Sequence, residues 1–199
     1  MLAYFVRHGE SETNVSGHFP DDYLKSPHLT ENGRRQAAEA GDMLSGISID
    51  AILSSPMPRT VETSEIISRR IGVKVGVDRR LKEVELGNLK GKPTSEIFTS
   101  DPDWFNEYFV DNNRYGIEKY DKIQERMMQS LQSARDAGYR SAVFVSHLEP
   151  IRSLVAVAMG VAGQAVRKVK IYNASITVFK YEDSIELHAV NVRPLKDYI

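Results

Sequence analysis

The chain has 199 residues, carries 26 lysines and arginines against 27 aspartates and glutamates, and contains no cysteine. This length is sufficient for one sizeable hydrophobic core, and the balanced charge gives no overall field that would favour nucleic acid or an anionic membrane. The lack of cysteine excludes disulfides, zinc–thiolate sites and catalysis by a cysteine nucleophile.

The first predicted strand, Leu2 to Val6, is an apolar run that stops at Arg7, His8 and Gly9. In open α/β sheets, ligands bind just beyond the carboxyl ends of the strands. There Arg7 would present a planar cation that matches phosphate oxygens, and His8 would present a nucleophilic nitrogen near neutral pH. Gly9 would let the backbone approach a ligand closely. Such a triplet is also typical of surface charge, so its meaning depends on the later segments.

Two helices and a strand are predicted next. Thr30 is the expected N-cap of a helix that runs to about Leu44. The strand 51–54 leads into a proline-marked helix that extends from about Arg59 and ends at Gly72. Arg59 would lie in the first turn, beside free backbone N–H groups that also favour an anion. The alternative is that Arg59 is a solvated residue at the helix start.

An acidic segment follows the β-branched stretch Val73 to Val77. Glu83 lies where a proton donor could act on a bound substrate. Glu85, two residues later, competes for this role, and Glu83 could instead be a surface carboxylate.

The least regular part of the chain, residues 90–116, has a group of aromatic residues between ends rich in Gly, Pro, Asp and Asn: Phe98, Trp104, Phe105, Tyr108 and Phe109. We expect this insertion to form a lid over the site that sets substrate size. The alternative is that the aromatic side chains simply pack against the main domain.

The C-terminal half repeats the order of strand, polar turn and helix. Apolar residues at helical spacing from Ile123 to Ala134 predict a helix closed by Gly138. The strand 142–146 then stops at His147, and the apolar stripe from Ile151 to Met159 predicts a core-facing helix. A histidine at the end of an apolar strand is costly to bury without partners, which favours a functional role for His147 over simple helix capping.

Residues 176–181 and 185–190 are predicted to form a hairpin with His188 on its outer face. His18 and His28 lie in a loop rich in Pro, Asp and Ser and are expected to face water.

These elements predict a single α/β domain over residues 1–199, with the lid insertion at about residues 90–116. The N-terminus enters a strand without a preceding basic and apolar leader, and the longest apolar stretch, 154–163, is too short to span a bilayer. We expect a cytoplasmic protein that binds neither membranes nor nucleic acid. A homodimer is compatible with these features.

Five motifs together resemble those of the histidine phosphatase superfamily, also called the phosphoglycerate mutase-like family. They follow the family's order from residue 7 to residue 152: Arg7-His8-Gly9-Glu10-Ser11 with Asn14, the segment 29–37, Ser54-Ser55-Pro56 with Arg59-Thr60, Glu83 with Gly87, and Ser146-His147 with Ile151-Arg152. The resemblance implies an α/β three-layer sandwich with a mostly parallel central sheet, helices on both faces and a small lid insertion.

The resemblance also implies catalytic roles that agree with the chemistry of these residues. His8 would attack phosphorus and become a transient phosphohistidine. Arg7, Arg59 and His147 would surround the phosphoryl oxygens, where charge stabilisation supplies most of the catalysis. Glu83 would protonate the leaving alkoxide and then accept a proton from the attacking water.

Two further residues are carried over as substrate contacts. Asn14 would donate a hydrogen bond to phosphate. Leu148 stands where the family commonly has a glycine after the second histidine.

Within the family, the sequence favours the phosphatase branch over the mutases. An arginine follows the acid in mutases, whereas Val84 follows Glu83 here. The cations of the segment after the acid include no adjacent arginine pair: Lys90, Lys92, Arg114 and Lys119. Glu149 adds a negative charge near the site, which would disfavour bisphosphates.

We therefore expect a metal-independent phosphomonoester hydrolase, without a cofactor, that acts on a small phosphorylated metabolite or a phosphoprotein. The alternatives are a cofactor-dependent phosphoglycerate mutase and a non-catalytic phosphate-binding regulatory module.

Overall fold

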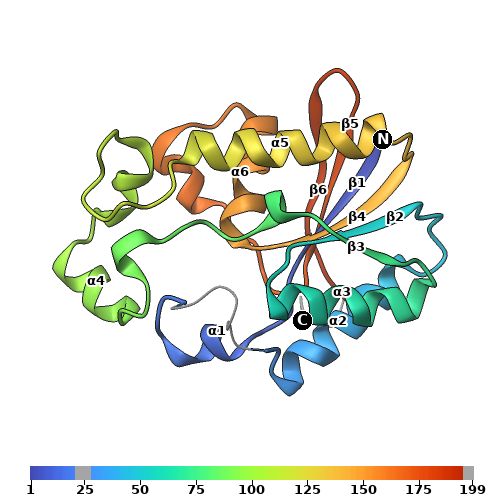
Figure 1. Cartoon of the computed structure of the whole chain (residues 1–199), viewed down its shortest axis with the longest axis horizontal. Helices are drawn as coiled ribbons and strands as arrows, with labels where there is room; N and C mark the ends of the chain where they lie inside the picture. The colour runs from blue at the N-terminus through green and yellow to red at the C-terminus, as the bar shows by residue number, and fades with distance from the viewer. Residues whose placement is uncertain (21–27, 195–199) are drawn as a thin grey trace.

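The computed structural model describes residues 1–20 and 28–194, and in this part of the chain a six-stranded sheet forms the centre of the molecule (Figure 1). The strand order is β3-β2-β4-β1-β5-β6. The strands are β1 (Leu2–Arg7), β2 (Ala51–Ser54), β3 (Val75–Val77), β4 (Ser141–Ser146), β5 (Ile176–Tyr181) and β6 (Ile185–Val192). β1 to β4 run parallel, β5 is antiparallel to β1, and β6 is antiparallel to β5. The sheet is therefore mostly parallel, as predicted.

The central strands are buried on both faces, which explains their nearly continuous apolar sequences. In β4, Ala142 and Phe144 belong to one core cluster and Val143 and Val145 to the other. Phe5 of β1 stacks on Phe144 with ring centroids 4.6 Å apart. Alternate residues of each strand thus anchor two separate layers.

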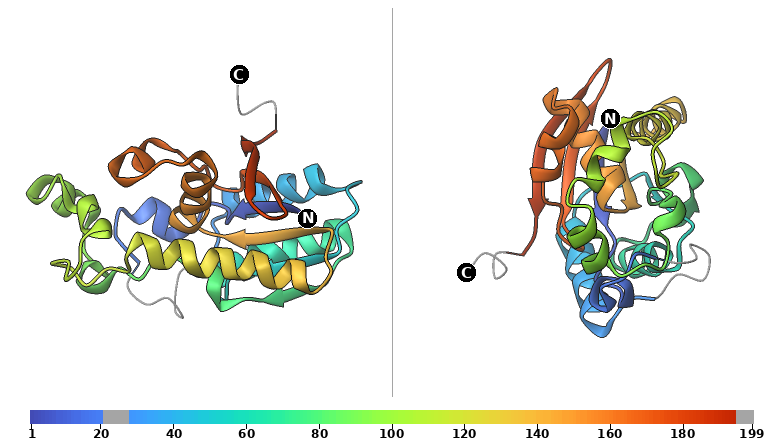
Figure 2. Two further views of the ribbon diagram at one scale, coloured as in Figure 1. Left: turned by 90° about the horizontal axis from the view of Figure 1, so that it is seen from above. Right: turned by 90° about the vertical axis from the view of Figure 1, so that its left-hand side faces the viewer.

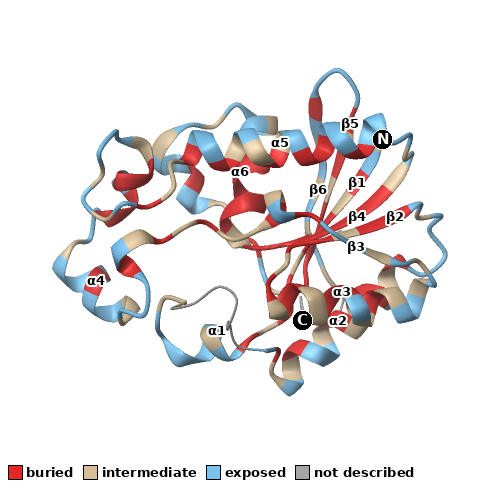
Figure 3. Cartoon of the chain, viewed as in Figure 1, coloured by how far each residue is buried: buried red, intermediate tan, exposed pale blue. Residues whose placement is uncertain are grey.

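Helices cover both faces of the sheet (Figures 1 and 2). α2 (Glu31–Leu44) and α3 (Pro58–Ile71) pack on one face, and α5 (Tyr120–Asp136) and α6 (Leu148–Met159) pack on the other. Buried residues follow the strands and the inner sides of these helices (Figure 3). The predicted three-layer α/β sandwich is confirmed.

Most of the predicted helix ends are confirmed. Thr30 accepts a hydrogen bond from the Gly33 amide and so caps α2, and Gly72 ends α3 with φ of 76°. Glycine suits this position because left-handed backbone costs it little.

Two details could not be read from the residue pattern. Of the β-branched stretch 73–77, only Val75–Val77 forms a strand, β3, which is an edge strand that pairs only with β2. Met159 is 57% exposed rather than buried, because it is the last residue of α6 before the turn at Gly160.

The segment between β3 and α5 begins over the middle of the molecule and reaches one end with α4, away from the β5–β6 hairpin (Figures 1 and 2). It contains η1 (Arg79–Leu81), η2 (Gly87–Leu89), α4 (Thr94–Ser100) and η3 (Trp104–Phe109). Trp104, Phe105 and Tyr108 are buried, whereas Phe98 is 46% exposed. The shorter elements elsewhere are α1 (Glu12–Ser16) and η4 (Gly163–Lys168). No helix in the described residues is long and apolar enough to cross a membrane.

Candidate active site

Three polar strand ends meet at one edge of the sheet. Arg7 at the end of β1 pairs in register with Ser146 at the end of β4, and Ser54 of β2 pairs with Val145. Because the three strands are parallel neighbours, the residues that follow them must leave the sheet side by side. Three sequence segments that are far apart in the chain thus meet here.

His8 is buried and has one ring nitrogen directed by the backbone. Its Nδ1 lies 2.7 Å from the Gly9 carbonyl oxygen, which can only accept, so Nδ1 carries the proton. Nε2 therefore has a lone pair, and it accepts a hydrogen bond of 3.1 Å from Arg59 Nε. Burial, Arg59 and Arg7 all lower the pKa of His8 well below its usual value. The imidazole is neutral at physiological pH, which is the form that acts as a nucleophile.

Gly9 serves the fold in a way that differs from the prediction. A Cβ at Gly9 would lie 2.3 Å from the carbonyl oxygen of Gly33 in α2, so the close approach is to another backbone segment rather than to a ligand. The Gly9 amide donates to Thr63 Oγ1 over 3.1 Å. These contacts fix the turn that presents His8.

Arg59 bridges the two site histidines and is 2% exposed, so the solvated alternative is wrong. Its Nη2 lies 3.2 Å from His147 Nδ1, which must accept because a guanidinium only donates. The other nitrogen of His147, Nε2, then donates to Ser55 Oγ over 2.9 Å. Proline at the start of α3 places Arg59 in its first turn, as predicted.

His147 is fully buried at the start of α6. It occupies the N-cap position, but its side chain makes no capping bond, so simple capping does not explain it. Burial and the nearby Arg59 lower its pKa well below the usual value. The rings of His8 and His147 lie 5.2 Å apart between centroids.

Arg7 brings a further cationic side chain to the site of His8 and Arg59. Its Nη1 donates to the Ile171 carbonyl over 2.6 Å, while its buried Nε has no partner among the described residues. Burial lowers the pKa of Arg7 to about 10, and the carboxylate of Glu83 partly opposes this effect. Arg7 therefore stays protonated at neutral pH.

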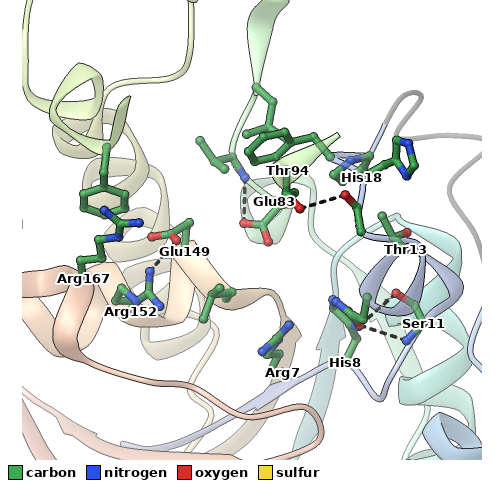
Figure 4. A pocket seen from close by; sticks show the side chains of 18 of the residues that line it. Arg7, His8, Ser11, Thr13, His18, Glu83, Thr94, Glu149, Arg152 and Arg167 are labelled. Carbon is green, nitrogen blue, oxygen red and sulfur yellow. Dashed lines mark hydrogen bonds and ion pairs between the residues drawn. The ribbon is translucent and has the colours of Figure 1, made fainter. Parts of the chain in front are cut away.

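Glu83 lines the cavity above Arg7 and His8 (Figure 4). One carboxylate oxygen accepts from the Val84 amide over 3.0 Å. Its rival Glu85 pairs instead with Lys82 at 2.6 Å and Lys90 at 3.2 Å. The structure thus brings Glu83, and not Glu85, to the predicted nucleophile.

Asn14 and Leu148 also line the cavity. The side-chain oxygen of Asn14 accepts from the Ser11 amide at 3.0 Å and from the Asn173 amide group at 3.1 Å. These bonds leave the NH₂ group of Asn14 to donate, as a phosphate contact requires.

The cavity has a volume of about 520 Å³ and is lined by further residues besides the predicted site residues. One part of its lining is aromatic: Phe19, Phe98, Trp104, Phe105 and Tyr108. Another part carries charges from α6 and the segment that follows it: Glu149, Arg152, Arg167 and Lys170. The first three of these are labelled in Figure 4.

Of these four charges, the sequence placed only Glu149 near the site, and the other three were not predicted to line the cavity. Arg152 belongs to the fifth motif, five positions after His147, and this spacing was the available signal. Arg167 and Lys170 lie in an irregular segment that carries no motif. Of the insertion's cations, Arg114 pairs with Asp101 and Glu107, and Lys119 pairs with Asp111 and Asp121.

The remaining histidines are placed almost as predicted. His28 and His188 are exposed. His18 is exposed too, but it also lines the rim of the cavity. Within the described part of the chain, no group of three or more His, Cys, Asp or Glu side chains is arranged to hold a metal ion.

Comparisons with known proteins agree with this geometry. A sequence model of the histidine phosphatase superfamily (branch 1) matches residues 3–192. The chain is 33% identical to a 2,3-bisphosphoglycerate-dependent phosphoglycerate mutase of Thermoplasma acidophilum, over 91% of this chain and 88% of the relative.

Solved structures match over almost the whole chain. Bacillus stearothermophilus YhfR has a TM-score of 0.81 at 28% identity, with 95% of each chain covered. A structure named mycobacterial hydrolase 1 has a TM-score of 0.84 at 24% identity, with 96% of this chain and 98% of that chain covered, and supports the fold.

Proposed function

Because the chain belongs to the histidine phosphatase superfamily, branch 1, we propose that it is a phosphomonoesterase in which His8 Nε2 accepts the phosphoryl group. The observation that carries this proposal is the buried chain of hydrogen bonds from His8 through Arg59 to His147. It presents a neutral nucleophile beside cations that suit a tetrahedral oxyanion.

The first step forms a phosphoenzyme. The lone pair of His8 Nε2 forms a bond to phosphorus while the ester P–O bond breaks, and Glu83 gives its proton to the leaving alkoxide. Arg59 now holds Nε2 through a hydrogen bond, so it must turn its N–H groups to the phosphoryl oxygens as the substrate enters. Arg7 and Asn14 bind the same oxygens.

The second step releases phosphate. Glu83, now a carboxylate, takes a proton from water, and the water oxygen attacks phosphorus as the N–P bond breaks. His8 returns to its neutral form and Glu83 to its acid form. Neither step uses a metal ion or a dissociable cofactor.

Phosphoglycerate mutase activity is the second candidate. The 33% identical relative bears that name, and the extra cations of the cavity could hold a second anionic group. A mutase would return the phosphoryl group to an alcohol instead of to water, so only the acceptor of the second step differs.

The test measures hydrolysis of p-nitrophenyl phosphate in the presence of a chelator, together with trapping of the phosphoenzyme. We expect turnover that persists with the chelator, stops with vanadate and is lost in His8→Ala. A phosphoryl adduct on the intact protein should be present in the wild type and in His188→Ala, whose histidine is exposed on β6. Phosphate binding without turnover would instead identify a regulatory module.

A second measurement distinguishes a mutase from a phosphatase. If isomerisation of phosphoglycerate, stimulated by a bisphosphorylated primer, greatly exceeds release of inorganic phosphate, the chain is a mutase and hydrolysis is a side reaction.

A further inference from the structure

A second group of charges lines the cavity without a role in the proposed phosphoryl transfer. We call Glu149, Arg152, Arg167 and Lys170 the α6–η4 wall. It places three cations beside one carboxylate. The substrate phosphoryl group would lie on Arg7 and Arg59, so it would leave the positive charge of this wall without a matching anion.

Arg152 is built into the wall rather than left on the surface. It is only 8% exposed. Its Nε donates to the Val169 carbonyl over 2.8 Å, and its Nη1 donates to Glu149 Oε1 over 2.6 Å. These bonds fix the plane of the guanidinium, and no hydrogen bond within the described residues uses Nη2. One side of a rigid cation is thus available to a ligand.

Two buried polar atoms of the cavity lining also lack partners within the described residues. They are Glu149 Oε2 and Trp104 Nε1, and both residues are more than nine-tenths buried and line the cavity. A buried polar atom without a partner is costly, so such atoms indicate a missing ligand or water. Trp104 reaches the wall through Phe105, whose ring lies 5.8 Å from that of Trp104 and 5.6 Å from the Arg167 guanidinium carbon. Trp104 and Arg152 can only donate, so a ligand that bonds to either of them must accept.

We propose that the α6–η4 wall, together with Trp104, is a second oxyanion subsite that binds a carboxylate or a phosphate at the far end of the substrate. This inference rests on the proposed function, because it assumes that the substrate's reacting phosphate occupies the His8 end of the cavity. The substrate class is then a phosphate ester whose alcohol part carries a second anionic group.

The protonation state of Glu149 makes anion binding at this subsite depend on pH. The pKa of Glu149 is raised to about 7, chiefly by burial and in smaller part by Glu83, while Arg152, Arg7 and Arg167 oppose the shift. Tyr120 of α5 also faces this group and stays neutral, because burial raises its pKa. An anion on Arg152 favours the protonated acid, whose O–H can donate to it. The sequence-based expectation that Glu149 repels a second anion therefore applies only above about pH 7.

The experiment measures equilibrium binding of non-hydrolysable alkyl phosphonates by calorimetry, so that its result does not depend on turnover. A series of increasing chain length carries a terminal carboxylate, a terminal phosphonate or, as the neutral reference, a terminal hydroxyl. We expect the anionic tails to bind about tenfold more tightly than the hydroxyl tail of the same length, as a charge-assisted hydrogen bond provides. The carboxylate and phosphonate arms identify which oxyanion is preferred.

Variants assign this preference to the wall. Arg167→Ala changes an exposed side chain and should remove most of the preference, and Arg152→Lys should reduce it because lysine lacks the planar fork. Lys168→Ala, at the exposed neighbouring position outside the cavity lining, is the matched control and should keep it. Between about pH 6 and about pH 8, the preference for the carboxylate tail over the hydroxyl tail should fall in the wild type and stay constant in Glu149→Gln. These two tails do not change charge over this range, and the titration of the phosphonate that both ligands share cancels in the ratio of their dissociation constants.

Equal binding of all tails at every chain length would overturn the subsite, and so would a preference that survives unchanged in both Arg167→Ala and Arg152→Lys. Neither result affects hydrolysis of p-nitrophenyl phosphate, which tests the proposed function separately.

Discussion

At the scale of single residues, the hydrogen bonds select the tautomer of each site histidine. The Gly9 carbonyl holds the proton of His8 on Nδ1, and Ser55 holds the proton of His147 on Nε2. Both remaining lone pairs face Arg59. One arginine therefore orients the proposed nucleophile, His8, and the proposed phosphate ligand, His147, which come from distant parts of the chain.

Glu83 offers a test of acid catalysis. Glu83→Gln should slow hydrolysis of alkyl phosphates at least about tenfold more than hydrolysis of p-nitrophenyl phosphate, because a basic alkoxide needs a proton to leave and a nitrophenolate does not. The kcat/KM values of the two esters measure this difference. Glu85→Gln is the control, because Glu85 pairs with Lys82 and Lys90. Equal slowing of both esters would remove the acid role from Glu83.

At the scale of elements, the turn after β1 depends on a close backbone crossing with α2. A Cβ at Gly33 would lie 1.9 Å from the Glu10 carbonyl oxygen, and no side-chain motion can relieve a clash with backbone. The position of His8 is thus coupled to the packing of α2.

Gly33→Ala should accordingly destabilise the protein by about 1–3 kcal/mol or more and lower the turnover of the protein that remains folded. Chemical denaturation and the rate per folded molecule measure the two effects. Gly76→Ala is the control, since its new methyl would meet Leu53 at an ordinary 3.4 Å. An unchanged unfolding free energy in Gly33→Ala would show that α2 can move away freely.

The insertion gives a second prediction at this scale. Phe98 lines the cavity and is 46% exposed, so Phe98→Ala should change the relative rates on large and small phosphate esters with little loss of stability. Val110→Ala, at a 43% exposed position of the same segment outside the cavity lining, should leave these ratios unchanged. Uniform scaling of all rates in Phe98→Ala would contradict the lid.

For the whole molecule, burying two neutral histidines links stability to pH. Their folded pKa values are lowered, so in the folded protein they bind no proton in the range where the unfolded chain begins to do so. The unfolding free energy should therefore fall below about pH 6.5, by about 1.4 kcal/mol per pH unit for each histidine until its folded pKa is reached. Urea unfolding from about pH 7.5 to about pH 5 measures this slope.

His147→Gln should show a smaller slope than the wild type, whereas His188→Gln should keep the wild-type slope because His188 is exposed. Identical slopes in all three proteins would mean that His147 binds protons in the folded state.

The sequence allowed the sheet, the main helices and the phosphate end of the cavity to be predicted, because each depends on local order. An apolar run that ends in Arg7-His8 or in Ser146-His147 indicates, within a few residues, both a strand and the polar site residues at its end. The α6–η4 wall could not be predicted in this way. Arg167 and Lys170 reach the cavity through an irregular segment whose course depends on tertiary packing. The exposed end of α6 at Met159 and the shortened β3 also depend on neighbours and not on spacing.

The antiparallel direction of β5 determines which segment could change in evolution to alter substrate contacts. Because β5 is antiparallel to β1, Ile176 at the start of β5 pairs with Val6 near the end of β1. The residues that precede β5 therefore lie at the same edge of the sheet as His8. Part of this stretch is bonded to the site, because the Ile171 carbonyl accepts from Arg7 and the Asn173 amide group donates to the His8 carbonyl and to Asn14. Substitutions that spare these bonds, such as changes at Lys170 in the cavity lining, would alter the contacts to a substrate and leave the paired strands in place.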